Sequence, residues 1–101
     1  MIRTLLALTV SVLALPSPAL AHGNVDCKAG SPASWKSVDA LKAKLTREGW
    51  KIKKAKREGN CYEVYGKTRD GDNVEAFFHP ATLERVMVMR RGKMIYRAPG
   101  F

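Results

Sequence analysis

NVEAFFHPATLERVMVMR, residues 73–90, decides the fold, because it holds two short runs in which side chains alternate in kind. The first run ends at Pro80 and places apolar residues at every second position, at Val74, Ala76 and Phe78. The second run, residues 85–90, alternates two valines with two methionines. A period of two is the pattern of a β-strand, and the short link between the runs predicts that the two strands pair antiparallel.

Segments on both sides of this stretch extend the predicted sheet. The first strand starts near Trp50, alternates apolar residues with lysines, and ends in a charged turn at residues 56–60. Residues 61–68 form the next strand, and residues 93–97 form the last one. Glycine and aspartate mark the turns between them, because they accept the backbone conformations that tight turns need. We therefore expect an antiparallel meander of four or five strands.

A single amphipathic helix precedes these strands. Ser34 or Ser37 can cap its start, and Gly49 lies just beyond its end. Its apolar residues recur at helical spacing, at Val38, Leu41 and Leu45. The sequence thus predicts an α+β fold in which this helix covers one face of the sheet.

The N-terminal segment has the layout of an export signal. Arg3 is followed by an apolar stretch over residues 5–15 and by the small-residue pattern Ala19-Leu20-Ala21. The apolar stretch covers 11 positions, whereas a membrane-spanning helix needs about 20. We expect a signal peptide over residues 1–21, an irregular lead-in over residues 22–34, and a protein that is periplasmic or secreted.

The chain is basic, with 18 Lys and Arg residues against 9 Asp and Glu residues. Loss of Arg3 with the leader leaves 17 basic residues and a formal net charge of +8. A charge of this sign favours attraction to anionic lipids, envelope polymers or acidic proteins. Basic side chains also bind nucleic acid, but export argues against nucleic acid as a natural partner, and we expect none.

Cys27 and Cys61 are the two cysteines of the chain. An even number of cysteines in an exported protein predicts a disulfide, because the compartments outside the cytoplasm are oxidising. A redox or metal pair is the alternative, but the two residues are far apart and no CxxC motif is present. We expect the disulfide to stabilise the fold by about 3 to 4 kcal/mol.

Five short motifs follow one another along the chain. They are Gly49-Trp50, Gly59-x-Cys61-Tyr62-Glu63-Val64, Asp70-Gly71, Val74-Glu75-x-Phe77 and Pro80-Ala81-Thr82-x-Glu84-x-Val86. In their order and spacing they resemble the PepSY family, and within it the small exported proteins that consist of one PepSY-like domain. The resemblance spans residues 35–89, and it implies a PepSY-like domain over residues 35–101 with an additional tail.

The resemblance implies a binding function without catalytic residues. Members of the family resemble propeptide modules that inhibit secreted peptidases or help them to fold. Two positions depart from the family pattern. His79 stands where the family has Asp before Pro-Ala-Thr, and Leu83 stands where it has Gly.

Candidate chemical sites are few. His22 and His79 could offer nitrogen ligands to a metal such as copper, but no third ligand lies close to them in the sequence. We expect His79 to be a turn histidine with local hydrogen bonds, and we expect no metal or cofactor site. Glu63 and Glu75 share one side of neighbouring strands, where ion pairs with lysines of the preceding strand are a simpler explanation than acid–base catalysis. No catalytic set is complete, so we do not expect an enzyme.

The outer face of the sheet, which points away from the helix, is the candidate binding surface. If Val64, Val86 and Val88 point to the helix, residues of the opposite parity point outward. The candidate partner-binding face comprises aromatic, methionine and basic residues, namely Tyr65, Phe77, Met87, Met89, Lys51, Lys53, Arg85 and Arg90. Aromatic residues, Met and Arg are enriched in protein interfaces. Alternatively, the lead-in or the tail, residues 93–101, folds over this face and covers it.

These observations favour an exported, non-catalytic PepSY-like binding module. Its partner is expected to be a protein of the cell envelope, either a peptidase or another protein whose action it modulates. The alternative is a basic protein that attaches electrostatically to anionic lipid or envelope polymer.

Overall fold

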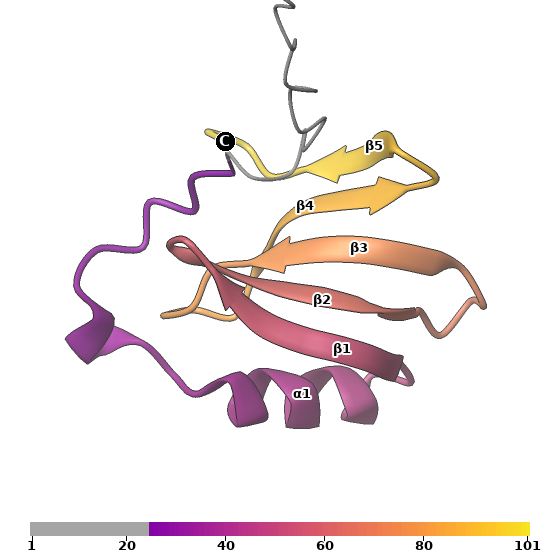
Figure 1. Ribbon diagram of the computed structural model, residues 1–101, viewed down its shortest axis with the longest axis horizontal. Coiled ribbons are helices and arrows are strands. Elements are labelled where there is room, and N and C mark those ends of the chain that lie inside the picture. The colour runs from indigo at the N-terminus through magenta and orange to yellow at the C-terminus, as the bar shows by residue number, and fades with distance from the viewer. Residues whose placement is uncertain (1–24) are drawn as a thin grey trace, which may run out of the picture.

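One helix and five strands succeed one another in the computed structural model, which describes residues 25–101. A short 3-10 turn, η1 (Pro32–Ser34), precedes them. The elements are α1 (Val38–Arg47), β1 (Lys51–Glu58), β2 (Cys61–Lys67), β3 (Asn73–Phe78), β4 (Arg85–Arg90) and β5 (Lys93–Arg97). The strands form a single antiparallel sheet in the order β1-β2-β3-β4-β5, and α1 lies beside β1 (Figure 1). The predicted α+β meander is confirmed, whereas the predicted leader and His22 lie outside the described residues.

Helix α1 begins and ends where its sequence provides caps. The Ser37 hydroxyl accepts a hydrogen bond from the backbone N–H of Ala40 at 3.0 Å, which satisfies a donor that the first turn leaves free. Gly49 adopts a φ of +92°, and the N–H of Trp50 then donates to the carbonyl of Leu45 at 3.0 Å. A glycine suits this position, because a left-handed backbone is strained for most other residues.

The core on the helix side joins α1 to the centre of the sheet. Its members are apolar residues of α1 and of alternate strand positions, namely Leu41, Leu45, Trp50, Tyr62, Val64, Val74, Ala76, Phe78, Leu83 and Val88. Trp50 packs edge-on against Phe78 with ring centroids 6.0 Å apart. The Tyr62 hydroxyl donates a hydrogen bond to the carbonyl of Lys36 at 2.6 Å, which fixes the segment that leads into the helix.

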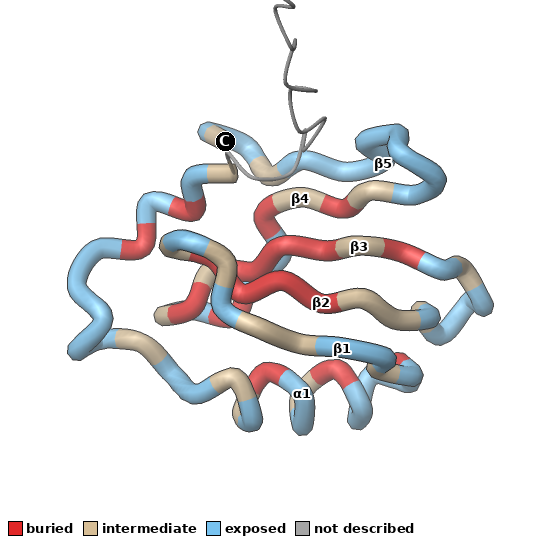
Figure 2. Tube along the Cα trace, in the orientation of Figure 1, coloured by how far each residue is buried: buried red, intermediate tan, exposed pale blue. Residues whose placement is uncertain are grey.

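A second core lies on the outer face of the sheet, and the lead-in covers it. Cys27 and Cys61 form a disulfide with their Cα atoms 5.4 Å apart, as the sequence predicts. The backbone N–H of Cys27 also donates to the Asn60 side chain at 3.0 Å. Phe77 is completely buried in this cluster, among residues that include Cys27 and Ala29, and Phe101 of the tail packs against it. Figure 2 shows the buried central strands beside the lead-in.

The sequence left two alternatives for the outer face, either open to solvent or covered by the lead-in or the tail. Each alternative holds for a part of this face. The part of this face around Phe77 is covered by both candidate segments, because the disulfide holds the lead-in there and the tail meets it. The Lys28 ammonium lies 5.2 Å from the centre of the Phe101 ring and also hydrogen-bonds the carbonyl of Gly100. The remainder of the outer face contains the candidate functional site.

The register of the sheet shifts at three places, between Ile52 and Lys54, between Phe77 and Phe78, and between Val88 and Met89. Each shift adds a residue to one strand and changes which side chains share a face. Val86 is such a residue, because Phe77 pairs with Met87 and Phe78 pairs with Arg85. The prediction that Val86 faces the helix is wrong, since it belongs to the outer cluster.

The first hairpin is tighter than the charged sequence indicates. β1 continues to Glu58, so that only Gly59 and Asn60 form the turn instead of residues 56–60. Arg57, which the predicted turn includes, pairs with Tyr62 and places its guanidinium 4.5 Å from the centre of the Trp35 ring. Three charged residues are thus part of a strand, because their partners across the hairpin hold them there.

Gly66 is required by the close approach of β1 and β2 at the first register shift. A Cβ atom at this position would lie 2.6 Å from the carbonyl oxygen of Lys51. We expect Gly66→Ala to lower the free energy of unfolding by about 1 to 3 kcal/mol, as overpacking does elsewhere. Urea denaturation measures the change, and the exposed neighbour substitution Lys67→Ala should stay within about 0.5 kcal/mol. Equal stability of Gly66→Ala and wild type would contradict this register.

Candidate functional site

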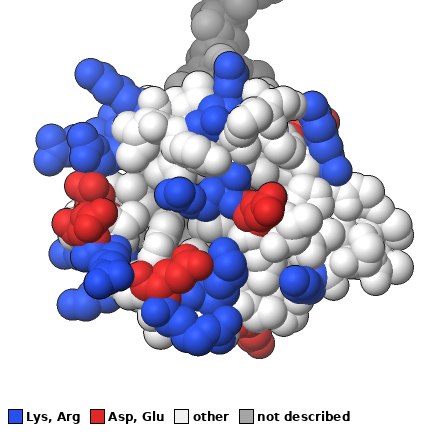
Figure 3. All heavy atoms as spheres, turned by 180° about the vertical axis from the view of Figure 1, so that it is seen from behind, with Lys and Arg blue, Asp and Glu red and all other residues white. Residues whose placement is uncertain are grey.

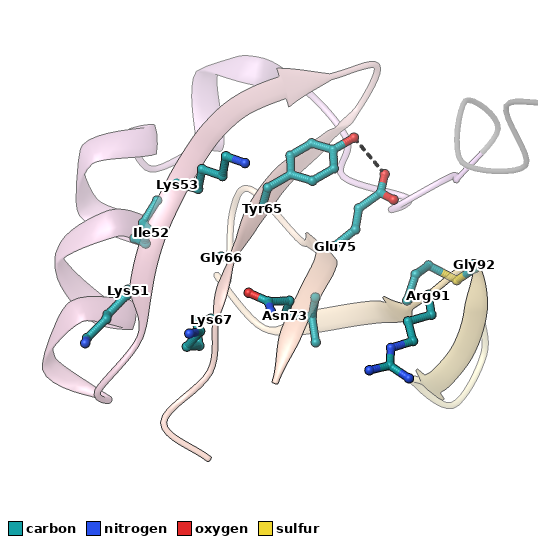
Figure 4. Close-up of a pocket in the computed structure, with 12 residues that line it drawn as sticks. Lys51, Ile52, Lys53, Tyr65, Gly66, Lys67, Asn73, Glu75, Arg91 and Gly92 are labelled. Atoms are coloured by element: carbon teal, nitrogen blue, oxygen red, sulfur yellow. Dashed lines mark hydrogen bonds between the residues drawn. The ribbon is translucent and has the colours of Figure 1, made fainter. Parts of the chain in front are cut away.

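A shallow basin occupies the part of the outer face that the lead-in does not cover. Its volume is about 520 Å³. Its lining comes from the start of β1, the end of β2, the start of β3, the end of β4 and the turn after it. The lining residues are Lys51, Ile52, Lys53, Tyr65, Gly66, Lys67, Asn73, Val74, Glu75, Met89, Arg91 and Gly92. Figure 4 shows Tyr65 and Glu75 joined by a hydrogen bond, with the basic side chains of Lys51, Lys53, Lys67 and Arg91 coming from β1, β2 and the turn after β4.

The strand register explains why these residues meet. Tyr65 pairs with Glu75, and Glu75 pairs with Met89, so the three side chains form one row across the sheet. The same row continues to Lys54 on one side and to Met94 on the other. A parallel row, in which Lys51 pairs with Lys67 and Lys67 with Asn73, borders the basin. Side chains of one row lie close enough for direct contact.

Tyr65 is held in place by acidic side chains. Its hydroxyl donates a hydrogen bond to Oε1 of Glu75 at 3.0 Å. The acceptor carboxylate of Glu63, partial burial and the carboxylate of Glu75 together raise the pKa of the Tyr65 hydroxyl far above its ordinary value of 10. Glu63 is only 2 % exposed, and its Oε1 has no hydrogen-bond partner within the described part of the chain.

The acidic residues differ from their expected arrangement. The register sets Lys56 opposite Glu63, whereas the lysines at the start of β1 lie opposite the end of β2. Lys56 itself forms an ion pair with Glu58 at 3.3 Å. The prediction of ion pairs from Glu63 and Glu75 to the first lysines of β1 did not include Tyr65, whose hydroxyl donates a hydrogen bond to Glu75.

The structure brings four of the eight predicted site residues together in the basin, namely Lys51, Lys53, Tyr65 and Met89. Phe77 is unsuitable as a contact residue, because it is completely buried below the lead-in. Met87 is half-buried against the same cluster. The alternation of side chains predicted the face to which Phe77 and Met87 point, but it could not predict that the lead-in covers this part of the face.

Two basic residues of the predicted partner-binding face lie elsewhere. Arg85 pairs with Phe78 after the register shift, and its guanidinium lies 4.9 Å from the centre of the Tyr96 ring on the helix side of the sheet. Arg90 forms an ion pair with Asp72 at 3.1 Å. Neither residue lines the basin, which contains the other two basic residues of the predicted face, Lys51 and Lys53.

Sequence reasoning missed three polar residues of the basin, Lys67, Asn73 and Arg91. Lys67 could have been found, because it continues the outward alternation of Glu63 and Tyr65 along β2. The turn at Arg91 has no such pattern. Its backbone φ of +51° directs the chain from β4 into β5, and only the structure reveals the position.

The basin is more basic than acidic. Four cations, those of Lys51, Lys53, Lys67 and Arg91, line it together with the single carboxylate of Glu75. The ion pairs of residues 25–101 use the cations of Lys44, Lys56 and Arg90, and none of the four basin cations. Figure 3 shows that Lys and Arg side chains on another face of the molecule are interspersed with Asp and Glu side chains.

The link between β3 and β4 has no metal-site geometry. Nδ1 of His79 accepts hydrogen bonds from the backbone N–H groups of Ala81 and Thr82 at 3.1 and 3.2 Å, which confirms the prediction of a turn histidine. Leu83, where the family pattern has glycine, adopts a φ of +63°. Its burial in the helix-side core offsets the strain of that conformation. Across residues 25–101, no three His, Cys, Asp or Glu side chains gather closely enough to hold a metal ion.

The arrangement defines a small disulfide-linked α+β domain with a polar, mainly basic basin on its sheet. The chain belongs to the PepSY family, because the family model described as "peptidase propeptide and YPEB domain" matches residues 4–88. The protein therefore contains a domain like those of peptidase propeptides. The match ends within β4, so β5 lies beyond it. Neither the curated proteins nor the solved structures contain a significant match.

The raised pKa of Tyr65 makes one pH-dependent prediction. Because its pKa is higher in the folded protein, Tyr65 loses its proton near pH 10 in the unfolded chain but only at higher pH in the folded protein. Its contribution to stability is therefore present below pH 10 and lost as the pH rises further. We expect Tyr65→Phe to be less stable than wild type at neutral pH, with a difference that shrinks as the pH rises above about 10. Urea unfolding of both proteins at each pH measures it, and a constant difference would contradict the account.

Proposed function

We propose that this protein is an exported, non-catalytic binding module that holds a protein of the cell envelope through the basin, with a peptidase as the first candidate partner. The observation that carries the proposal is the basin itself, in which four cations surround Tyr65 and Met89 on a domain of the peptidase propeptide family. The proposal assigns the basin a role in contact, without a reaction step.

Export is supported by two independent features of the chain. The N-terminal sequence has the charge, apolar stretch and small-residue pattern of a signal peptide. The Cys27–Cys61 disulfide is typical of proteins that fold in oxidising compartments. We assign the protein to the periplasm or the extracellular medium on these grounds.

The chemistry of the basin suits an acidic protein surface. Tyr65 and Met89 are residue types enriched in interfaces, and the hydrogen bond to Glu75 orients the tyrosine before a partner arrives. The surrounding cations have no acidic partner among the ion pairs of residues 25–101. An acidic patch with an apolar centre would complement both properties, and opposite charges would also accelerate the encounter.

The formal net charge of +8 after export also favours the alternative of attachment to anionic lipid or polymer. Such attachment is strongest when one face is uniformly basic. On the face that Figure 3 shows, acidic groups lie among the basic ones, and the basin itself includes the carboxylate of Glu75. No helix among residues 25–101 is long and apolar enough to cross a membrane. Because the surface charges are mixed, we rank a protein partner above an anionic surface, and the experiment below separates the two.

Site-specific photo-crosslinking in intact cells tests this proposal. A benzoylphenylalanine replaces Lys53 at the basin in one variant and the exposed Lys42 of α1 in a matched variant. We expect position 53 to yield a discrete crosslinked protein that position 42 does not yield, identified by mass spectrometry. If that protein is a peptidase, its activity is then measured with and without the purified module.

Charge reversal supplies the matched control. Lys51→Glu/Lys53→Glu should weaken binding to the crosslinked protein at least about tenfold, or about 1.4 kcal/mol. Lys42→Glu/Arg47→Glu makes the same change of charge on exposed positions of α1 and should leave binding within about twofold. Crosslinks that go only to lipid, or equal losses in the two double variants, would contradict a partner site in the basin.

A further inference from the structure

The two edges of the sheet differ in their protection. At one edge, α1 lies along β1, a register shift interrupts the strand, and exposed lysines project from it (Figure 1). Charged residues, bulges and a covering helix are the common means by which proteins prevent unwanted strand pairing. At the opposite edge, β5 pairs only with β4 within residues 25–101. Figure 2 shows β5 exposed along its length.

The exposed strand β5 is apolar in its middle. Met94, Ile95 and Tyr96 are 47 %, 50 % and 37 % exposed, and they are the large hydrophobic residues most open to solvent in the described chain. A strand edge of this kind is a template for pairing with another extended segment. Because β5 lies beyond residues 4–88, this feature does not follow from the family match.

The sheet offers room for the side chains of an added strand. On the helix side, depressions of about 650 and 380 Å³ meet at Trp50, Arg85 and Tyr96, and Ile95 lines the smaller one. Side chains of an added strand alternate between the two faces, so every second side chain could enter these depressions. The main chain would supply hydrogen bonds, and the depressions would select the side chains.

The charges of β5 identify the kind of strand that fits. From Arg85 to the end, the chain carries five basic residues and no acidic residue. Lys93 and Arg97 end the strand, and both are exposed. A second copy paired antiparallel about Ile95 would set Lys93 of one copy opposite Arg97 of the other, and like charges in opposing positions destabilise a sheet.

We propose that the free edge of β5 binds an extended segment of a partner protein as a sixth strand, and that this segment has an apolar middle and acidic ends. The segment would pair its main chain with β5, place apolar side chains beside Tyr96 and Ile95, and set its carboxylates near Lys93 and Arg97. This surface adds to the basin, and it depends on the function proposed above only in requiring a protein partner.

A synthetic heptapeptide tests the inference. The probe is Asp-Val-Thr-Val-Thr-Val-Asp with blocked ends and a fluorescent label, and the protein is the full chain expressed for export and purified with its disulfide intact. We expect saturable binding by fluorescence anisotropy, and NMR shift changes concentrated in β5 and β4. Methylation of the peptide nitrogens on one of its two edges should weaken binding at least about tenfold, because a strand pairs through alternate main-chain groups.

A charge swap provides a control that does not depend on the peptide alone. Lys93→Glu/Arg97→Glu should prefer a peptide with lysine ends over the acidic peptide, which reverses the wild-type preference. The basin variant Lys51→Glu/Lys53→Glu should bind the acidic peptide within about twofold of wild type. Circular dichroism verifies that each variant is folded.

Three results would overturn the inference. The first is the absence of binding at about 1 mM peptide, since a Kd of about 1 mM corresponds to a binding free energy of only about −4 kcal/mol. The second is binding that tolerates methylation of either peptide edge. The third is NMR shift changes that map to the basin or β1. A dimer in sedimentation whose interface maps to β5 by NMR would assign the edge to a second copy instead. Because the probe is synthetic, each of these results is distinct from a failure of the crosslinking experiment.

Discussion

The disulfide between Cys27 and Cys61 is the constraint on which the outer face depends. It joins a lead-in without regular structure before η1 to the first residue of β2, with a sequence separation of 34. Closure of a loop of this size restricts the unfolded chain by about 3 to 4 kcal/mol, a large share of the stability of a small domain. The bridge also holds Ala29 and Cys27 against Phe77, which the tail approaches through Phe101. Without it, this apolar area would have no cover from the N-terminal side.

The covered area determines where the protein can bind. Phe77 lies beneath the lead-in, so contact with a partner is left to the other end of the outer face, where Tyr65 and Met89 share a row with Glu75. The helix has a similar effect on the edges, because it lies along β1 and leaves β5 open. The disulfide-bonded lead-in thus covers one part of the outer face, and the helix covers the β1 edge. Two surfaces, the basin and the β5 edge, remain available for contact. The basin is polar and basic, whereas the edge is apolar with basic ends.

The sequence was most informative where local rules decide the structure. Alternation predicted the bounds of β4, and the turn residues before it predicted β5. The spacing of apolar residues predicted α1, and the parity of the cysteines predicted the disulfide. It failed where distant parts of the chain interact. An alternating pattern contains no information on a register shift, which moved Arg85 to the helix side and Val86 to the outer cluster. Nor does it reveal burial by a remote segment, which removed Phe77 from the candidate site.

Solvent accessibility of Phe77 in the native, disulfide-bonded protein tests the central claim most directly. A soluble paramagnetic agent broadens NMR signals of exposed groups, so the ring of Phe77 and the methyl group of Met89 can be compared within one sample. Phe77 is fully buried and Met89 is partly exposed. The account predicts little broadening for Phe77, contacts between its ring and the Ala29 methyl group, and clear broadening for Met89. Equal broadening of both residues without contacts to Ala29 would contradict the account.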